Sequence, residues 1–83
     1  MKIYSIKDTK GSFYDPMLAL NDALATRNVR GVVNSGKGIL AQYPEDFELW
    51  LIGEFDQETG IITPLPLTFI VRLNSLVDNN ANA

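Results

Sequence analysis

The clearest pattern of apolar and polar positions lies between residues 47 and 56. Successive side chains of a β-strand point to opposite faces, so a strand that is buried on one face alternates. One face would carry Phe47, Leu49, Leu51, Gly53 and Phe55, and the other Glu48, Trp50, Ile52, Glu54 and Asp56. We expect the first set in the core. Turn-forming residues 57–60 and the apolar 61–63 predict a hairpin, and Pro64 and Pro66 keep the partner strand from becoming central.

The N-terminus predicts a second, shorter hairpin. Residues 2–7 mix β-branched and aromatic residues with polar ones, residues 8–11 supply turn chemistry, and residues 12–14 resume an extended pattern. Pro16 disfavours helical geometry at Asp15 and removes a backbone donor. The second strand should therefore end there or lie at a sheet edge.

Residues 22–34 form the best candidate for a helix. Asn21 suits the N-cap and Asp22 the positive end of the helix dipole. At 100° per residue one broad apolar face carries Leu24, Ala25, Val29, Val32 and Val33, while Arg27, Arg30 and Asn34 lie on another. Residues 35–38, Ser-Gly-Lys-Gly, end the helix; a phosphate-cradling loop is the weaker alternative, because it would have to join a strand to the following helix.

These elements predict a small single α+β domain over residues 1–77. Two β-hairpins form an antiparallel sheet that packs against one main helix. Phe69, Leu73, Leu76 and Val77 fit a helical stripe, so we expect a short C-terminal helix, although residues 69–71 also fit a strand. Residues 78–83 are polar and small and predict a flexible tail.

Composition argues against enzymatic chemistry. The 83 residues contain no histidine and no cysteine, which removes the commonest general base, the thiol nucleophile and the usual ligands of transition metals. Carboxylates flank the predicted strand and loop at Glu45, Asp46, Glu48, Glu54, Asp56 and Glu58. They could hold calcium or magnesium, but acids in such positions are usually solvated. We expect no catalytic residues, no metal and no cofactor. The lack of cysteine also favours a reducing cytoplasm.

Charge is unevenly distributed along the chain. The net charge is −3, with six cations and three acids in residues 1–40 (+3) and one cation and seven acids in residues 41–83 (−6). Arg27 and Arg30 share a helix face, and Lys37 follows the helix, so the three could contact successive phosphates. A solvated polar face is the plainer alternative. Trp50 could stack on a base or seal a dimer, or could lie under a second packed layer.

A run of residues in the second half resembles a viral family. Residues 44–56, Pro-Glu-Asp-Phe-Glu-Leu-Trp-Leu-Ile-Gly-Glu-Phe-Asp, are followed by Gly60 and Pro64. With Phe13, Pro16, Asn21, Asp22, Ala25 and Arg27 upstream, they are similar to a small nonstructural protein of gokushoviruses, which are single-stranded DNA phages of the microvirus group. The resemblance covers roughly residues 3–66. Val29 departs from it, because the family pattern has phenylalanine there.

The resemblance implies a non-enzymatic DNA-binding protein of phage replication. Its role would be to turn replication toward single-strand synthesis and packaging, in the cytoplasm of the infected bacterium. Single-stranded DNA would then be the partner, with Arg27, Arg30 and Lys37 contacting phosphates and Trp50 or Tyr43 stacking. The main alternative is a protein–protein adaptor, as a monomer or a homodimer, that acts on phage or host replication proteins without DNA contact. An internal scaffolding or capsid-associated role is third. No stretch of about 18 apolar residues or signal sequence suggests a membrane.

The expected absence of a bound metal can be tested by chelation. A structural ion stabilises the folded state by mass action, so its removal lowers the melting temperature. We expect thermal melts with and without EDTA to coincide. A melting temperature that falls by several degrees on chelation would reveal an ion held by the acidic half.

Overall fold

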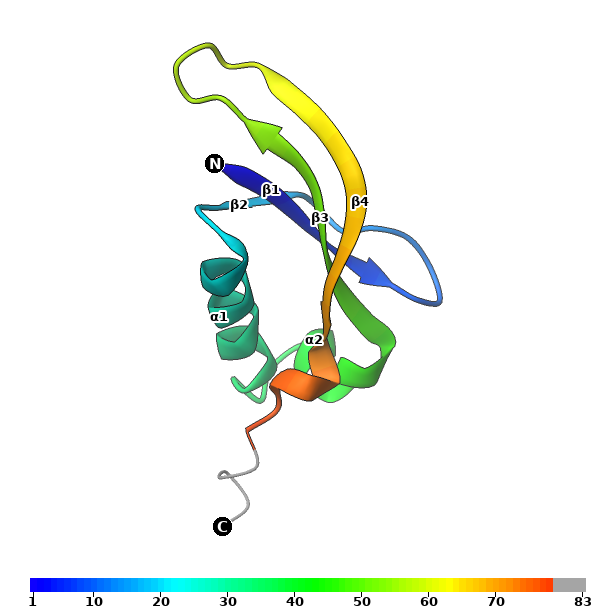
Figure 1. The fold of residues 1–83 in the computed structure, drawn as a ribbon. Coiled ribbons are helices and arrows are strands. Elements are labelled where there is room, and N and C mark those ends of the chain that lie inside the picture. Colours follow the sequence, from blue (N-terminus) through cyan, green and yellow to red (C-terminus); the bar gives the residue numbers. More distant parts are fainter. Residues whose placement is uncertain (79–83) are drawn as a thin grey trace.

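A four-stranded antiparallel sheet with one main helix against it forms the body of the protein (Figure 1). The structure is a computed structural model, and it describes residues 1–78. The strands lie in the order β2-β1-β3-β4. In chain order the elements are β1 (Lys2–Asp8), β2 (Met17–Ala19), α1 (Asp22–Val33), α2 (Ile39–Gln42), the 3-10 turn η1 (Pro44–Asp46), β3 (Phe47–Phe55), β4 (Ile62–Arg72) and the 3-10 turn η2 (Leu73–Leu76). The α+β fold class is confirmed.

The hairpin β3–β4 is the longest feature of the sheet and curves beyond α1 (Figure 1). Its loop closes where the Asp56 N–H donates to the Ile61 carbonyl at 2.9 Å, and Gly60 adopts a φ of 77° that favours glycine. β4 lies at the sheet edge, as its prolines require. It nevertheless continues through both of them for 11 residues.

Gly53 allows β3 and β4 to approach each other closely. A Cβ at this position would lie 3.0 Å from the Thr63 carbonyl oxygen and 3.5 Å from Cδ1 of Ile3. The register between the strands shifts between Leu51 and Gly53. A side chain here would therefore push against backbone at the point where the hairpin is irregular.

Two predicted elements differ from the structure. The expected second strand over residues 12–14 was wrong: Phe13 makes only an isolated bridge to Lys7, and the strand that pairs with β1 follows Pro16 as β2. Met17 and Ala19 turn toward the core there, and Pro16 lies before the strand, so it removes none of the strand's backbone donors. The C-terminal helix was predicted to extend from residue 69, but residues 69–72 belong to β4 and only η2 is helical.

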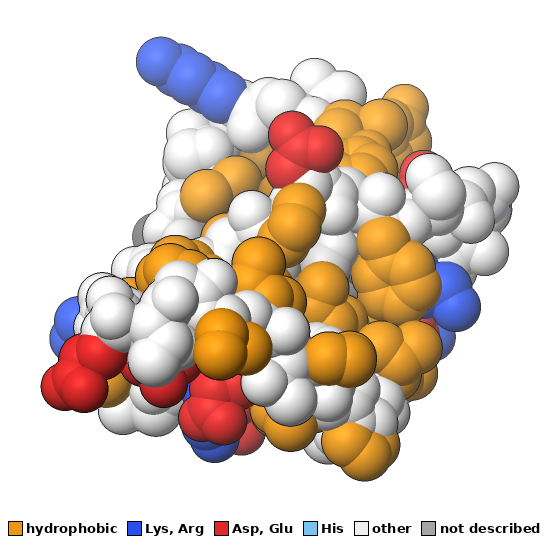
Figure 2. Space-filling view, turned by 90° about the horizontal axis from the view of Figure 1, so that it is seen from above, with side chains coloured by type: hydrophobic (Ala, Val, Ile, Leu, Met, Phe, Trp, Pro, Cys, Tyr) orange, Lys and Arg blue, Asp and Glu red, His pale blue; other side chains and the backbone are white. Residues whose placement is uncertain are grey.

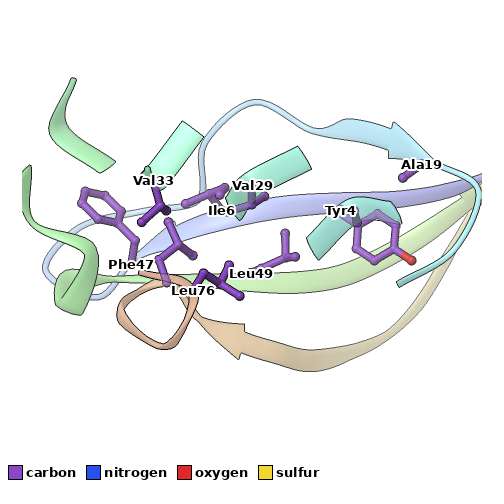
Figure 3. Close-up of a cluster of buried hydrophobic side chains, with 10 residues drawn as sticks. Tyr4, Ile6, Ala19, Val29, Val33, Phe47, Leu49 and Leu76 are labelled. Carbon is purple, nitrogen blue, oxygen red and sulfur yellow. The ribbon is translucent and has the colours of Figure 1, made fainter. Parts of the chain in front are cut away.

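The core lies between α1 and one face of the sheet (Figure 3). β1 and β3 contribute one set of buried side chains, and α1, β2 and η2 contribute the other: Tyr4, Ile6, Phe47 and Leu49 meet Ala19, Ala25, Val29, Val33, Leu73 and Leu76. The helix was predicted correctly, including Asn21, whose side-chain oxygen accepts from the Leu24 N–H at 2.9 Å. Val29 is only 3% exposed, so the smaller side chain still packs in the core.

Tyr4 connects the central strand to the start of the helix. Its ring is fully buried, and its hydroxyl donates a hydrogen bond to Oδ1 of Asp22 in the first turn of α1. Burial, and then the nearby carboxylate, raise the pKa of Tyr4 far above its ordinary value. The phenol is therefore neutral in the folded protein at any physiological pH.

Asn34 performs the corresponding role at the other end of α1. Its Nδ2 donates to the carbonyls of Arg30 and Leu76, both at 2.9 Å, and its Oδ1 accepts from the Asp78 N–H at 2.8 Å. One side chain thus caps the helix and holds the segment after η2. The flexible tail was predicted from residue 78; Asp78 is held by this bond, and residues 79–83 lie outside the described residues.

Replacing Asn34 by alanine removes all three of these side-chain hydrogen bonds. At a net value near 1 kcal/mol each, less for those exposed to water, we expect a loss of about 2 kcal/mol of unfolding free energy. In a domain of this size the melting temperature should fall by roughly 8–15 °C. Asn28→Ala on the same helix is the matched control, because Asn28 makes no side-chain hydrogen bond with any described residue. Equal losses in the two variants would contradict the role given to Asn34.

Tyr4 should make the protein sensitive to high pH. Because the folded-state pKa is raised, the contribution of Tyr4 is fully present below the unfolded pKa of about 10 and is lost as the pH rises above it. The melting temperature of the parent should therefore fall more steeply between pH 9 and about 11 than that of Tyr4→Phe. Parallel curves for the two proteins would show that Tyr4 does not couple folding to pH.

Candidate nucleic-acid interface

The two faces of the sheet have different surroundings. α1 packs on the face that carries Leu49 and Ile6, whereas the neighbouring residues Trp50 and Ser5 pair with each other and point to the other face. Among the described residues, no helix packs against this second face. We call it the open face.

Three aromatic rings from distant parts of the chain meet on the open face. The ring centroids of Phe13 and Trp50 are 6.4 Å apart, and those of Trp50 and Phe69 are 5.8 Å apart, both edge to face. We call Phe13, Trp50 and Phe69 the aromatic row. The Nζ of Lys7 lies 5.6 Å from the Phe13 ring centroid and 5.7 Å from that of Trp50. The two outer rings are 40% and 48% exposed, so the row presents aromatic surface to solvent beside a cation.

Hydrogen bonds at the edges of the aromatic row hold it in place. Ser5 Oγ donates to the Tyr14 carbonyl at 2.7 Å, and the Tyr14 N–H donates to the Ile6 carbonyl at 2.7 Å, which fixes the backbone next to Phe13. Trp50 Nε1 donates to Glu48 at 3.1 Å, and Arg72 pairs with the same carboxylate at 2.9 Å. The indole N–H is therefore already satisfied, and what the row offers is the faces and edges of its rings.

A shallow apolar hollow lies toward the other end of the sheet. It has a volume of about 280 Å³ and is lined by Ile3, Pro16, Leu18, Phe55 and Ile62. Register places Leu18 opposite Ile3, and Ile62 opposite Phe55, so the side chains of each pair share a face. On β1, Ile3 lies two residues before Ser5, which pairs with Trp50, and four before Lys7, which pairs with Phe13, so roughly 7–13 Å of strand separate it from the row. The hollow and the aromatic row are thus separate features of the open face.

The predicted nucleic-acid-binding residues do not form one site. Arg27 and Arg30 are exposed on the side of α1 away from the buried Val29, and Lys37 is exposed in the loop that follows the helix. None of the three makes a salt bridge with the described residues. Tyr43 is 51% exposed between α2 and η1. Trp50 lies across the sheet from α1, so a base stacked on it would not contact the arginines.

The neighbours of Trp50 were not predicted from the sequence. Lys7, Phe13 and Phe69 come from different segments, and only strand register brings them together. Arg72 was not predicted either, and its guanidinium is occupied by Glu48. One usable signal was the polar face of residues 2–7, which identifies Lys7 as pointing away from the core.

The acidic loop has a structural role. The Asp56 carboxylate accepts from the N–H groups of Glu58 at 2.9 Å and Thr59 at 3.3 Å, and these bonds lower its pKa. It closes the β3–β4 turn. Among the described residues no three His, Cys, Asp or Glu side chains are grouped to hold a metal ion. Nor does any helix in residues 1–78 have the length and apolar character of a membrane span.

Comparison with known proteins shows where the chain belongs. The family model described as "Phage ORF5 protein" matches residues 1–77. Protein ORF5 of Chlamydia phage 1 is 34% identical over 80 residues, which cover 90% of this chain and 83% of the relative. No solved structure matches. The match spans every element described above, from β1 to η2. The chain therefore belongs to the phage ORF5 protein family.

Proposed function

We propose that this protein is a non-enzymatic single-stranded DNA-binding accessory of phage genome replication, and that it acts in the cytoplasm of the infected bacterium. DNA binds to the open face. The aromatic row with Lys7 beside it is the observation that supports this proposal. Membership of a phage protein family agrees with a role in an infection, and the lack of histidine and cysteine agrees with a non-catalytic one.

Base stacking explains why the protein would prefer single-stranded DNA to duplex DNA. Aromatic side chains on a sheet bind bases that are already unstacked, each stack is worth about 1–3 kcal/mol, and the interaction tolerates any base. A duplex keeps its base faces covered. The exposed rings of Phe13 and Phe69, at the two ends of the row, are the ones that bases can reach.

Electrostatics would contribute little at this surface. Lys10 is paired with Asp46 at 3.5 Å and Arg72 with Glu48 at 2.9 Å, so Lys7 is the one cation beside the aromatic row without a salt bridge to a described residue. The logarithm of the binding constant should then fall with the logarithm of the salt concentration with a slope near −0.7, the value for about one phosphate. Binding that depends mainly on stacking should therefore keep most of its affinity as the salt concentration rises.

The outer face of α1 remains the competing DNA surface. If Arg27, Arg30 and Lys37 contacted three phosphates, the slope would be about −2. The salt dependence of the parent protein therefore distinguishes the two surfaces before any residue is changed.

An adaptor that binds phage or host replication proteins is the second candidate function. The apolar surface of the open face favours it, because exposed apolar patches mark protein contacts as well as ligand sites. A scaffolding role would use the same surface. A protein that binds no single-stranded DNA in any salt would support this candidate over the first.

Phe13→Ala and Phe69→Ala test the aromatic row. Each removes one exposed ring, and we expect each to weaken the binding of an oligothymidylate by roughly 5- to 100-fold through the lost stacking. Fluorescence anisotropy of a labelled oligonucleotide gives the affinity, and quenching of Trp50, the one tryptophan in the chain, reports contact at the row.

The controls separate binding from folding and from charge. Ile39→Ala removes a similarly exposed apolar side chain from α2, and it should leave binding unchanged. The double variant Arg27→Ala/Arg30→Ala should also bind as the parent does. If the arginine variant loses binding while Phe13→Ala and Phe69→Ala keep it, with all melting normally, the helix surface is the DNA site and the aromatic row is not.

A further inference from the structure

The open face carries an apolar patch as large as those that often mark functional surfaces on small monomers. Four of its apolar side chains are 40–65% exposed: Phe13, Leu18, Ile62 and Phe69. Side chains of this size offer roughly 150–250 Å² each, so the four expose on the order of 400 Å² before Trp50 and Phe55 are added. Patches on monomers reach about 300–600 Å², and each partner of a standard stable interface buries about 800 Å². Figure 2 shows apolar side chains in a broad group at the surface seen from above.

The shape of the open face is self-complementary. The aromatic row lies beside Ser5 and Lys7, toward the Asp8 end of β1, and the hollow lined by Leu18 and Ile62 lies toward the Lys2 end. A two-fold axis that lies between two facing sheets, perpendicular to their strands, exchanges these ends. The row of one copy then lies over the hollow of the other, and the reverse contact is made at the same time, as an isologous interface requires.

We infer that two copies of this chain form a homodimer through their open faces. The two sheets pack face to face about 10 Å apart, with the helices on the outside. The aromatic row of each copy packs over the apolar hollow of the other. This inference does not depend on the proposed DNA binding, but it uses the same face, so DNA and the second copy exclude each other.

Pairing of sheet edges is a less favourable route to a dimer. β4 carries Pro64 and Pro66, which cannot donate backbone hydrogen bonds to a new strand. The other edge, β2, is only three residues long. Both edges are thus poor templates, whereas the open face offers area and shape together.

The mass of the protein in solution tests the dimer without DNA. Sedimentation equilibrium should give twice the 9.2 kDa chain mass, and Trp50 emission should shift to shorter wavelength as the protein concentration rises. Leu18→Glu and Ile62→Glu each place a carboxylate in the hollow, on different strands. Each should weaken dimerisation by roughly 100-fold or more, because the charge would have to be buried unpaired. Ile39→Glu on α2 is the matched control and should remain a dimer.

Each result decides the inference. A parent protein that stays monomeric at millimolar concentration overturns it, and so does a dimer that persists in both hollow variants while these remain folded by circular dichroism. Failure of the dimer inference can be distinguished from failure of the proposed DNA binding. A monomer that binds oligothymidylate overturns the dimer alone, and a dimer that binds no DNA overturns the DNA proposal alone.

Discussion

A single helix of 12 residues can cover only one face of a four-stranded sheet, and much else in this molecule depends on that limit. The chain places its best-packed side chains, from β1, β3 and α1, on the covered face. The bond from Tyr4 to Asp22 and the contacts of Asn34 fasten the two ends of α1 to that layer. The opposite face carries the aromatic row, Lys7 and apolar residues from the strand ends. Both proposals concern this uncovered face.

Local patterns were sufficient to predict the elements whose signals are complete within about a dozen residues. α1 carries its own cap and apolar stripe, and β3 alternates as far as Leu51, so both elements were predicted closely. The prediction that Phe55 lies in the core was wrong, because the register shift after Leu51 turns Phe55 toward the hollow of the open face. β2 and the C-terminal half of β4 were not. Met17–Ala19 is too short for a pattern, and its place is decided by pairing with β1. Residues 69–72 fit two periodicities, and only pairing with β3 selects the strand.

The residues of the candidate site were also hard to predict, because contacts between distant segments bring them together. Trp50 was identified because a large aromatic on the polar face of a strand is conspicuous. Phe13 and Phe69 were not, since their distance to Trp50 depends on two strand registers and one isolated bridge. Arg27 and Arg30 could be assigned to a solvent-exposed helix face from periodicity, and Lys37 could be assigned to solvent from its place beyond the helix. Whether that surface binds DNA is still a prediction.

The two prolines of β4 affect what happens when the protein accumulates. A long edge strand with exposed isoleucine and leucine can pair with strands of other copies, and repeated pairing of this kind produces an open-ended fibril. Pro64 and Pro66 interrupt the row of donors along that edge over its most apolar part. A chain with no disulfide and a small core can therefore be produced in quantity with less risk that its longest strand starts a fibril.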